Sequence, residues 1–167
     1  MYRRILVPTD GSDISSVAVE AAIAFARICG GDIVALSIAQ PEPVMLTAEG
    51  ALASGEFQVD VLLEQARRQV DRVAEAAARA GVPCTPVTGY GYSPADEIVE
   101  AARRHGCDLV FMASHGRRGL SRLIAGSVTQ RVLAYAPVPV MVYRPHLAHA
   151  QGEQVRPPAP AGAGAAG

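Results

Sequence analysis

The sequence predicts an α/β fold in which a five-stranded, doubly wound parallel sheet carries helices on both faces. Short apolar runs alternate four times with longer segments whose apolar residues recur at helical spacing. The chain has 167 residues, of which 50% are hydrophobic and 5% aromatic, so one domain with an aliphatic core is expected. Alternating strands and helices are typical of a parallel sheet covered on both sides.

Five apolar runs are expected to form the strands. The first run ends at Pro8, and the third contains Pro83 and Pro86. Proline cannot donate to the hydrogen bonds of a sheet, so the third strand is expected to be irregular or to lie at an edge. The expected strands are residues 5–7, 33–39, 82–88, 109–112 and 138–143.

Four segments between these strands have helical periodicity, and most have recognisable ends. Gly30 and Gly31 stop the first helix. Ser93 as N-cap and Pro94 at the first helical position begin the third. Residues 127–130, Ser-Val-Thr-Gln, fit a capping box with Ser127 as the N-cap of the fourth. The expected helices are residues 14–28, 59–77, 94–105 and 128–136.

Two segments are expected to lie outside this regular pattern. Residues 40–57 contain two prolines and two glycines, and we expect a long mobile loop, with or without one short helix. From about His146 the chain is rich in Ala, Gly and Pro and has almost no bulky apolar residue, so a disordered tail is expected. The folded domain is therefore assigned to residues 1–145 and the tail to residues 146–167.

Charge and hydropathy exclude several classes of protein. The net charge is -1 and the sequence pI about 6.4, which gives no electrostatic reason to expect nucleic-acid binding. No apolar run approaches the roughly 20 residues of a membrane span. The first four residues are not followed by the long apolar stretch of a signal peptide. A soluble cytoplasmic protein is expected.

The types of reactive side chain in the sequence limit the classes of reaction that the protein could catalyse. All 15 basic residues are arginine, and without lysine a P-loop, a Schiff-base enzyme or a kinase cannot operate in its usual form. The three cysteines, Cys29, Cys84 and Cys107, include no C-x-x-C pair. Reduced, buried thiols are expected rather than a redox or metal site.

Two loops that come after expected strands, residues 8–12 and 113–127, carry small and polar residues. Ligands of a doubly wound sheet bind beyond the carboxyl ends of its strands, so both loops would face one crevice. The second loop leads into a helix N-terminus, which favours phosphate. Gly116 and Gly126 would let the backbone approach a phosphate, unless they are ordinary loop glycines. The hydroxyls of Ser127 and Thr129 could donate to it.

Other side chains of these loops have two interpretations each. Asp10 accepts hydrogen bonds from a ribose hydroxyl or holds a phosphate-bound metal, or else it caps the turn directly after it. His115 has no recognisable carboxylate or serine partner, which favours a donor to ligand or backbone over a general base. Arg117, Arg118 and Arg122 either attract a polyphosphate or keep the loop soluble.

Over about residues 2–144 the chain resembles the universal stress proteins of bacteria and archaea. Residues 5–12, Ile-Leu-Val-Pro-Thr-Asp-Gly-Ser, and residues 137–143, Pro-Val-Pro-Val-Met-Val-Tyr, are similar to the family's first and last strands. The family's ATP-binding pattern is Gly, two residues, Gly, nine residues, then Gly with Ser or Thr. Here Ala113 replaces its first glycine, which is harmless at negative φ and costs about 1 kcal/mol at positive φ.

The resemblance implies a Rossmann-like fold of the adenine nucleotide alpha-hydrolase type and a regulatory or stress-response role. It implies ATP as ligand, with Mg²⁺ held through the phosphates rather than by a metal site of the protein, and a homodimer paired through residues 138–143. By position, Asp10 would contact adenosine and Ile38 would lie beside adenine. The expected ATP-binding residues are Pro8, Thr9, Asp10, Ile38, Met112, Ala113, His115, Gly116, Arg117, Gly126, Ser127, Val128 and Thr129.

The sequence leaves two rival functions to be tested. No set of residues supplies a positioned base and an electrophilic clamp, so substantial turnover is not expected, and slow ATP hydrolysis is left open. One rival is a dimeric interaction protein that binds no nucleotide. The other is an ATP-dependent adenylating enzyme, whose relatives carry Ser-Gly-Gly-x-Asp-Ser after the first strand. Residues 9–15 here, Thr-Asp-Gly-Ser-Asp-Ile-Ser, lack that glycine pair.

Overall fold

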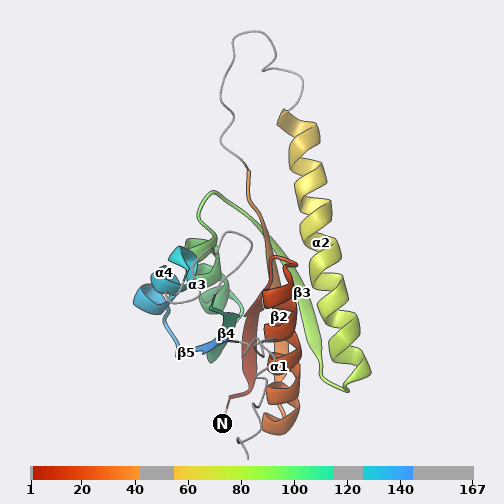
Figure 1. Cartoon of the computed structure of the whole chain (residues 1–167), viewed down its shortest axis with the longest axis vertical. Helices are drawn as coiled ribbons and strands as arrows, with labels where there is room; N and C mark the ends of the chain where they lie inside the picture. The colour runs from red at the N-terminus through yellow and green to blue at the C-terminus, as the bar shows by residue number, and fades with distance from the viewer. Residues whose placement is uncertain (1, 42–54, 115–125, 145–167) are drawn as a thin grey trace, which may run out of the picture.

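The computed structural model describes residues 2–41, 55–114 and 126–144, which form a five-stranded parallel sheet in the order β3-β2-β1-β4-β5 (Figure 1). The doubly wound α/β fold predicted from the sequence is confirmed. The strands are β1 (Arg4–Pro8), β2 (Asp32–Ala39), β3 (Cys84–Tyr90), β4 (Leu109–Ala113) and β5 (Val140–Tyr143). The helices are α1 (Asp13–Cys29), α2 (Gly55–Arg79), α3 (Pro94–Arg104) and α4 (Ser127–Tyr135).

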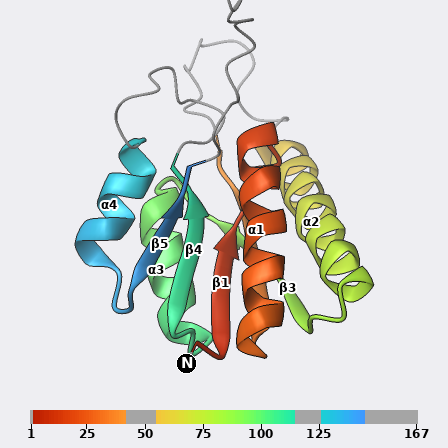
Figure 2. The ribbon, with the colours of Figure 1, turned by 60° about the horizontal axis from the view of Figure 1, so that its bottom comes forward.

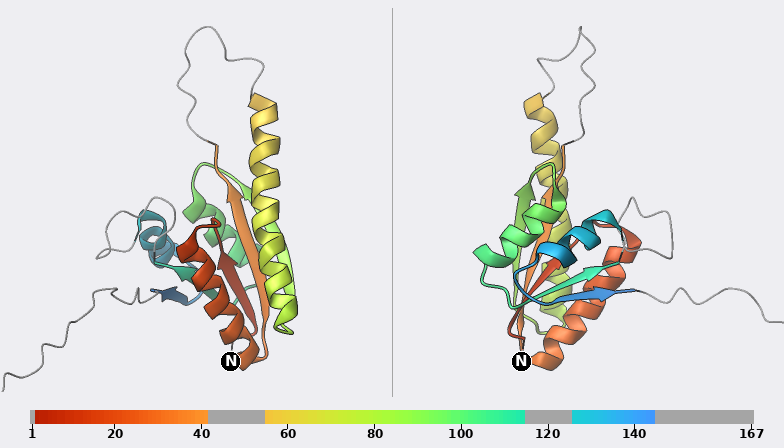
Figure 3. Two further views of the ribbon diagram at one scale, coloured as in Figure 1. Left: turned by 45° about the vertical axis from the view of Figure 1, so that its right-hand side comes forward. Right: turned by 90° about the vertical axis from the view of Figure 1, so that its left-hand side faces the viewer.

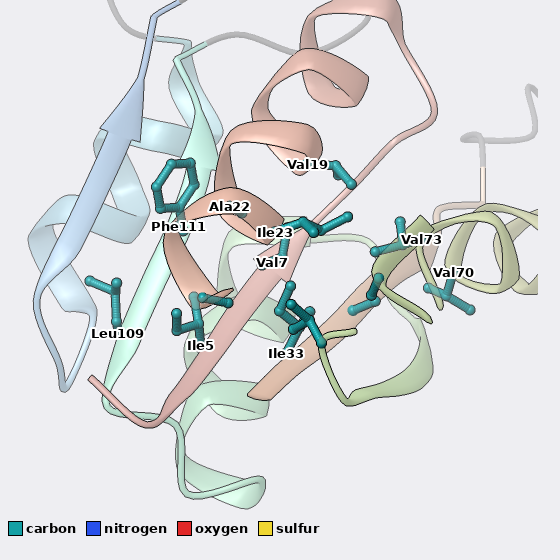
Figure 4. Close-up of a cluster of buried hydrophobic side chains, with 14 residues drawn as sticks. Ile5, Val7, Val19, Ala22, Ile23, Ile33, Val70, Val73, Leu109 and Phe111 are labelled. Carbon is teal, nitrogen blue, oxygen red and sulfur yellow. The ribbon is translucent and has the colours of Figure 1, made fainter. Parts of the chain in front are cut away.

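Two hydrophobic cores lie on opposite faces of the sheet, because successive strand residues point to opposite sides. Ile5 and Val7 of β1 face α1 and α2, whereas Leu6 between them faces α3 and α4 (Figure 2). Figure 4 shows the first core, in which Ile23 of α1 and Val73 of α2 lie over the sheet. Each core holds its pair of helices against one face. Because all strand pairs are parallel, the carboxyl ends of the strands lie at one edge of the sheet.

The loop after β1 and the start of α1 are fixed by local hydrogen bonds. Ser12 is the N-cap, and its hydroxyl accepts a hydrogen bond from the backbone N–H of Ser15 at 3.3 Å. At the other end, Gly30 adopts φ 66°, a left-handed conformation that glycine reaches without steric cost. Both the turn before α1 and its glycine stop are confirmed.

Two helix starts differ from the sequence prediction. Helix α2 begins at Gly55, inside the segment 40–57 that was expected to be a long loop with or without one short helix. Residues 42–54 of that segment lie outside the described residues. The N-cap of α4 is Gly126, not Ser127, because the Gly126 carbonyl already accepts the helical hydrogen bond from the N–H of Gln130 at 3.0 Å. The predicted capping box is therefore wrong, and Ser127 is the first residue of the helix.

Strand β3 lies at an edge of the sheet, one of the two outcomes that Pro83 and Pro86 predicted, and Pro86 alone lies within the strand. It pairs with β2 only, and Pro86 lies opposite Ala35 in the parallel register. The other edge strand is β5. No described helix is long and apolar enough to cross a membrane. The tail predicted for residues 146–167 lies outside the described residues.

The three thiols are expected to differ in reactivity, and none of them is in a disulfide. Cys107 is buried, and burial is the main cause that raises its pKa to about 11. Alkylation requires the thiolate. With this pKa, only about one Cys107 side chain in a thousand is ionised at pH 8. We expect iodoacetamide at pH 8 to modify the half-buried Cys29 well before Cys107, as followed by peptide mass spectrometry. Equal rates in the folded protein would contradict this burial, and unfolding in urea should equalise them.

Candidate functional site

A cavity of about 630 Å³ lies at the carboxyl ends of β1, β2 and β4. The chain winds from β1 outward to β2 and β3, and then crosses to β4 and β5 on the other side. The crevice between β1 and β4 is therefore the topological switch point, where sheets of this class bind ligands. Helix α2, which runs along β2 and β3 (Figure 3), closes one side of the cavity. The opposite side is formed by the first turns of α3 and α4.

The structure brings the predicted site residues of both loops together. Every expected ATP-binding residue that the structure describes lines this cavity, although the two loops are about a hundred positions apart in sequence. His115, Gly116 and Arg117 lie outside the described residues. The lining residues that were expected are Pro8, Thr9, Asp10, Ile38, Met112, Ala113, Gly126, Ser127, Val128 and Thr129.

Asp10 is the only carboxylate among the described residues that line the cavity. Its Oδ1 accepts hydrogen bonds from the backbone N–H of Ser12 at 3.0 Å and from the Ser12 hydroxyl at 2.7 Å. These contacts form the turn that the sequence offered as one interpretation of Asp10. They also hold the carboxylate in one orientation at the cavity wall, so the turn and a ligand contact are compatible.

The loop around Asp10 is held rigidly on both sides. The Thr9 hydroxyl shares a hydrogen bond with the Ser15 hydroxyl at 3.1 Å and accepts one from the Gly11 N–H at 3.2 Å. Gly11 adopts φ +73°, and a Cβ there would lie only 3.0 Å from Nε2 of Gln69. The left-handed conformation favours glycine at this position, and a larger residue would also have to displace the side chain of Gln69.

The first turn of α4 faces the cavity without a side-chain cap. Gly126 has φ -58° and ψ 156°, and its own N–H donates to the Ser114 carbonyl at 3.0 Å. Because glycine has no side chain, it cannot accept a hydrogen bond from the N–H groups of Ser127, Val128 and Thr129. Such N–H groups at a helix start carry partial positive charge and favour an anion. Phosphate is one of the anions that bind at such helix starts.

The hydroxyl of Thr129 was expected to donate to a phosphate, but in the structure it has another partner. Its side chain is 2% exposed, and Oγ1 donates to the carbonyls of Ala113 and Ser114, at 3.3 and 3.2 Å. The hydroxyl therefore ties the first turn of α4 to the end of β4 instead of pointing at a ligand. Ser127 is exposed at the cavity, so its hydroxyl remains a candidate phosphate donor.

Replacing Thr129 should loosen the attachment of α4 to the sheet. Thr129→Val keeps the shape of the side chain but removes the donor to two carbonyls, so we expect the free energy of unfolding to fall by about 1–3 kcal/mol. Urea denaturation followed by circular dichroism measures this. Ser127→Ala, on the same turn but exposed, is the matched control and should change stability by less than about 0.5 kcal/mol. Equal effects of the two substitutions would rule out the role assigned to Oγ1.

The replacement of the motif glycine by Ala113 is tolerated by the backbone. No described residue other than glycine has a positive φ, and Ala113 is the last residue of β4, paired with Tyr143 of β5. At a negative φ a Cβ carries no conformational penalty. This departure from the family pattern therefore does not strain the loop.

Several cavity residues were not found by sequence reasoning. Helix α2 contributes Leu62, Gln65 and Gln69, and Gln69 accepts a hydrogen bond from the Ser37 hydroxyl at 2.6 Å. The loop between β3 and α3 contributes Tyr92, whose side chain is 72% exposed. The sequence contained one sign that α2 lines the cavity. Gln65 and Gln69 are uncharged polar residues four positions apart, on a helix whose other surface residues are mostly charged.

Arg131 of α4 is the only cation among the described residues that line the cavity. Its Nε and Nη2 donate to the two carboxylate oxygens of Asp96 on α3, each at 3.1 Å. Within the described ranges no group of three or more His, Cys, Asp or Glu side chains is placed to hold a metal ion.

Comparison with known proteins places this arrangement in a family. The universal stress protein family matches residues 1–144. Universal stress protein MJ0531 of Methanocaldococcus jannaschii is 36% identical over 145 residues, which are 86% of this chain and 83% of the relative. The solved structure of protein MJ0577 from the same organism has a TM-score of 0.70 at 26% identity and covers 87% of this chain and 97% of its own.

Two more distant structures share the fold and contain ligands. A universal stress protein in complex with cAMP has a TM-score of 0.60 at 22% identity and covers 86% of this chain and 97% of its own. The universal stress protein of Archaeoglobus fulgidus in complex with dAMP has a TM-score of 0.60 at 19% identity, with 84% and 97% covered. At 22% and 19% identity, the similarity of these two structures to the chain shows a shared fold only. The family match over residues 1–144 and the 36% identical relative lead to one conclusion: the chain belongs to the universal stress protein family.

Proposed function

We propose that this universal stress protein binds ATP in the cavity at the switch point. The observation that carries the proposal is that segments far apart in sequence supply a carboxylate, apolar side chains and the start of helix α4 to one cavity of about 630 Å³. Ligand-binding cavities typically measure about 300–1,000 Å³. The structures of distant relatives with cAMP and dAMP support an adenine nucleotide as the class of ligand.

The walls of the cavity suit the three parts of the nucleotide. Adenine would lie against the apolar side chains of Ile38 and Met112, at the ends of β2 and β4. Asp10 would accept hydrogen bonds from the ribose hydroxyls. The phosphates would lie at the first turn of α4, where N–H groups without a side-chain cap begin at Ser127. Mg²⁺ would be held mainly through phosphate oxygens.

The biological role proposed is regulatory rather than catalytic, in the cytoplasm. Among the described residues lining the cavity, Asp10 is the only carboxylate and none is a histidine or cysteine. We propose a homodimer paired through residues 138–143. Strand β5 supports this, because it pairs with β4 on one side and is an edge of the sheet on the other.

Analysis of retained ligand tests the proposal without a choice of substrate. Protein purified without added nucleotide is denatured, and the released small molecules are identified by mass spectrometry. Recovery of ATP in proportion to protein is the expected result. A protein that carries no adenine nucleotide and takes up none on incubation with ATP and Mg²⁺ would instead favour a dimeric interaction protein. Stoichiometric release of pyrophosphate with a second substrate would favour an adenylating enzyme.

A further inference from the structure

An ion pair between two helices lies at the margin of the cavity. Arg131 is on the second turn of α4 and Asp96 is on the first turn of α3, and these helices pack side by side (Figure 2). The two hydrogen bonds, from Nε to Oδ1 and from Nη2 to Oδ2, give the parallel geometry in which a guanidinium binds a carboxylate most strongly. The same pair of donors also matches the geometry of a phosphate group.

The ion pair is also exposed enough for another anion to replace Asp96 as the partner of Arg131. The side chains are 56% and 55% exposed, and an ion pair in such contact with water contributes little to the stability of the fold. Arg131 lines the cavity, whereas Asp96 does not. A ligand with more negative charge than one carboxylate, placed in the cavity, would therefore compete with Asp96 for the same guanidinium.

We infer that Arg131 binds a phosphate group of the ligand, and that Asp96 binds the same guanidinium when the cavity is empty. By competing for Arg131, Asp96 lowers the affinity of the cavity for phosphate-bearing ligands. The inference rests on the proposed nucleotide function. On binding, the guanidinium exchanges the carboxylate of Asp96 for a phosphate of the nucleotide. The ion pair then sets the preference of the cavity for a nucleotide over a nucleoside. It also links the packing of α3 against α4 to whether the cavity holds a nucleotide.

Two substitutions with opposite expected effects test the inference by calorimetric titration of ligand-free protein. Arg131→Gln should raise the Kd for ATP by about 10-fold, and Asp96→Asn should lower it by about 3-fold. Neither should change the Kd for adenosine by more than about 2-fold, because adenosine has no phosphate. Arg131→Lys keeps the charge but loses the parallel pair of hydrogen bonds, so an intermediate Kd for ATP is expected.

A second ion pair on α3 supplies matched controls. Arg104 and Glu100 are 3.7 Å apart, are similarly exposed and do not line the cavity. Arg104→Gln and Glu100→Gln remove the same charges and should leave the Kd for ATP unchanged. If they shift it as much as the Arg131 and Asp96 variants do, the effect is one of net charge and the inference is wrong.

The double variant separates competition from a general electrostatic effect. In an Arg131→Gln background, Asp96→Asn should no longer improve ATP binding, since the group it competes for is gone. An improvement that persists in this background overturns the inference. If the wild-type protein binds ATP and Arg131→Gln binds it equally well, the inference fails alone. If the wild-type protein binds neither ATP nor adenosine, the proposed function fails with it.

Discussion

Gly126→Val is expected to abolish ATP binding while leaving the fold largely intact. Gly126 has φ -58° and ψ 156°, a conformation open to any residue, so valine adds no backbone strain. Its branched side chain would instead stand in front of the N–H groups at the start of α4, where the phosphates are proposed to bind. Each hydrogen bond to a charged group contributes about 1.5–3 kcal/mol, so losing two or more weakens binding by at least about 100-fold.

Two measurements make this expectation specific. Circular dichroism and thermal unfolding should show a folded Gly126→Val protein, with a modest loss because valine is a poor N-cap. Gly126→Ala, which adds one methyl group in the same place, should bind ATP more weakly than the wild type and more tightly than the valine variant. A valine variant that binds ATP with wild-type affinity would show that the phosphates do not lie at the start of α4.

Asp10→Ala is expected to remove the recognition of the ribose. A hydrogen bond from a hydroxyl to a carboxylate contributes about 1.5–3 kcal/mol, which corresponds to about 10- to 150-fold in Kd. In the wild type, ATP should therefore bind more tightly than its 2′,3′-dideoxy analogue, and in Asp10→Ala the two should bind alike. Titration of both ligands into both proteins gives the comparison.

Ser12→Ala controls for the structural role of Asp10. It removes the hydroxyl that donates to Asp10 Oδ1 at 2.7 Å but leaves the carboxylate in place. It should lower stability while preserving the preference for ATP over the dideoxy analogue. Loss of that preference in Ser12→Ala, or its survival in Asp10→Ala, would mean that Asp10 only shapes the turn.

The sheet and its order of elements could be predicted because they depend on periodicity and on strong breakers. The apolar run around Leu6 is buried on both faces, and Gly30 can stop a helix because it adopts a left-handed conformation. Helix starts were less certain, because a start depends on one hydrogen bond. Ser127 begins the pattern of a capping box, yet the Gly126 carbonyl accepts the first helical bond.

The candidate site could be predicted only in part, because a sequence shows which residues come after each strand but not which residues pack across the crevice. Asp10 was found because it comes directly after a strand, and Gly126 because it comes just before a helix start at the end of the loop that follows β4. Gln69 was not, because its position on α2 indicated only a helix surface. Arg131 was missed for a similar reason, since the parallel sheet brings α3 beside α4 only in three dimensions.

Calorimetric titration of ligand-free protein with ATP and Mg²⁺ tests the central claim most directly. The account predicts a saturable heat with one ATP bound per chain, and loss of that heat in Gly126→Val. The contradictory result is the absence of saturable heat for the wild-type protein up to millimolar ATP, at two temperatures so that a zero enthalpy at one of them is excluded.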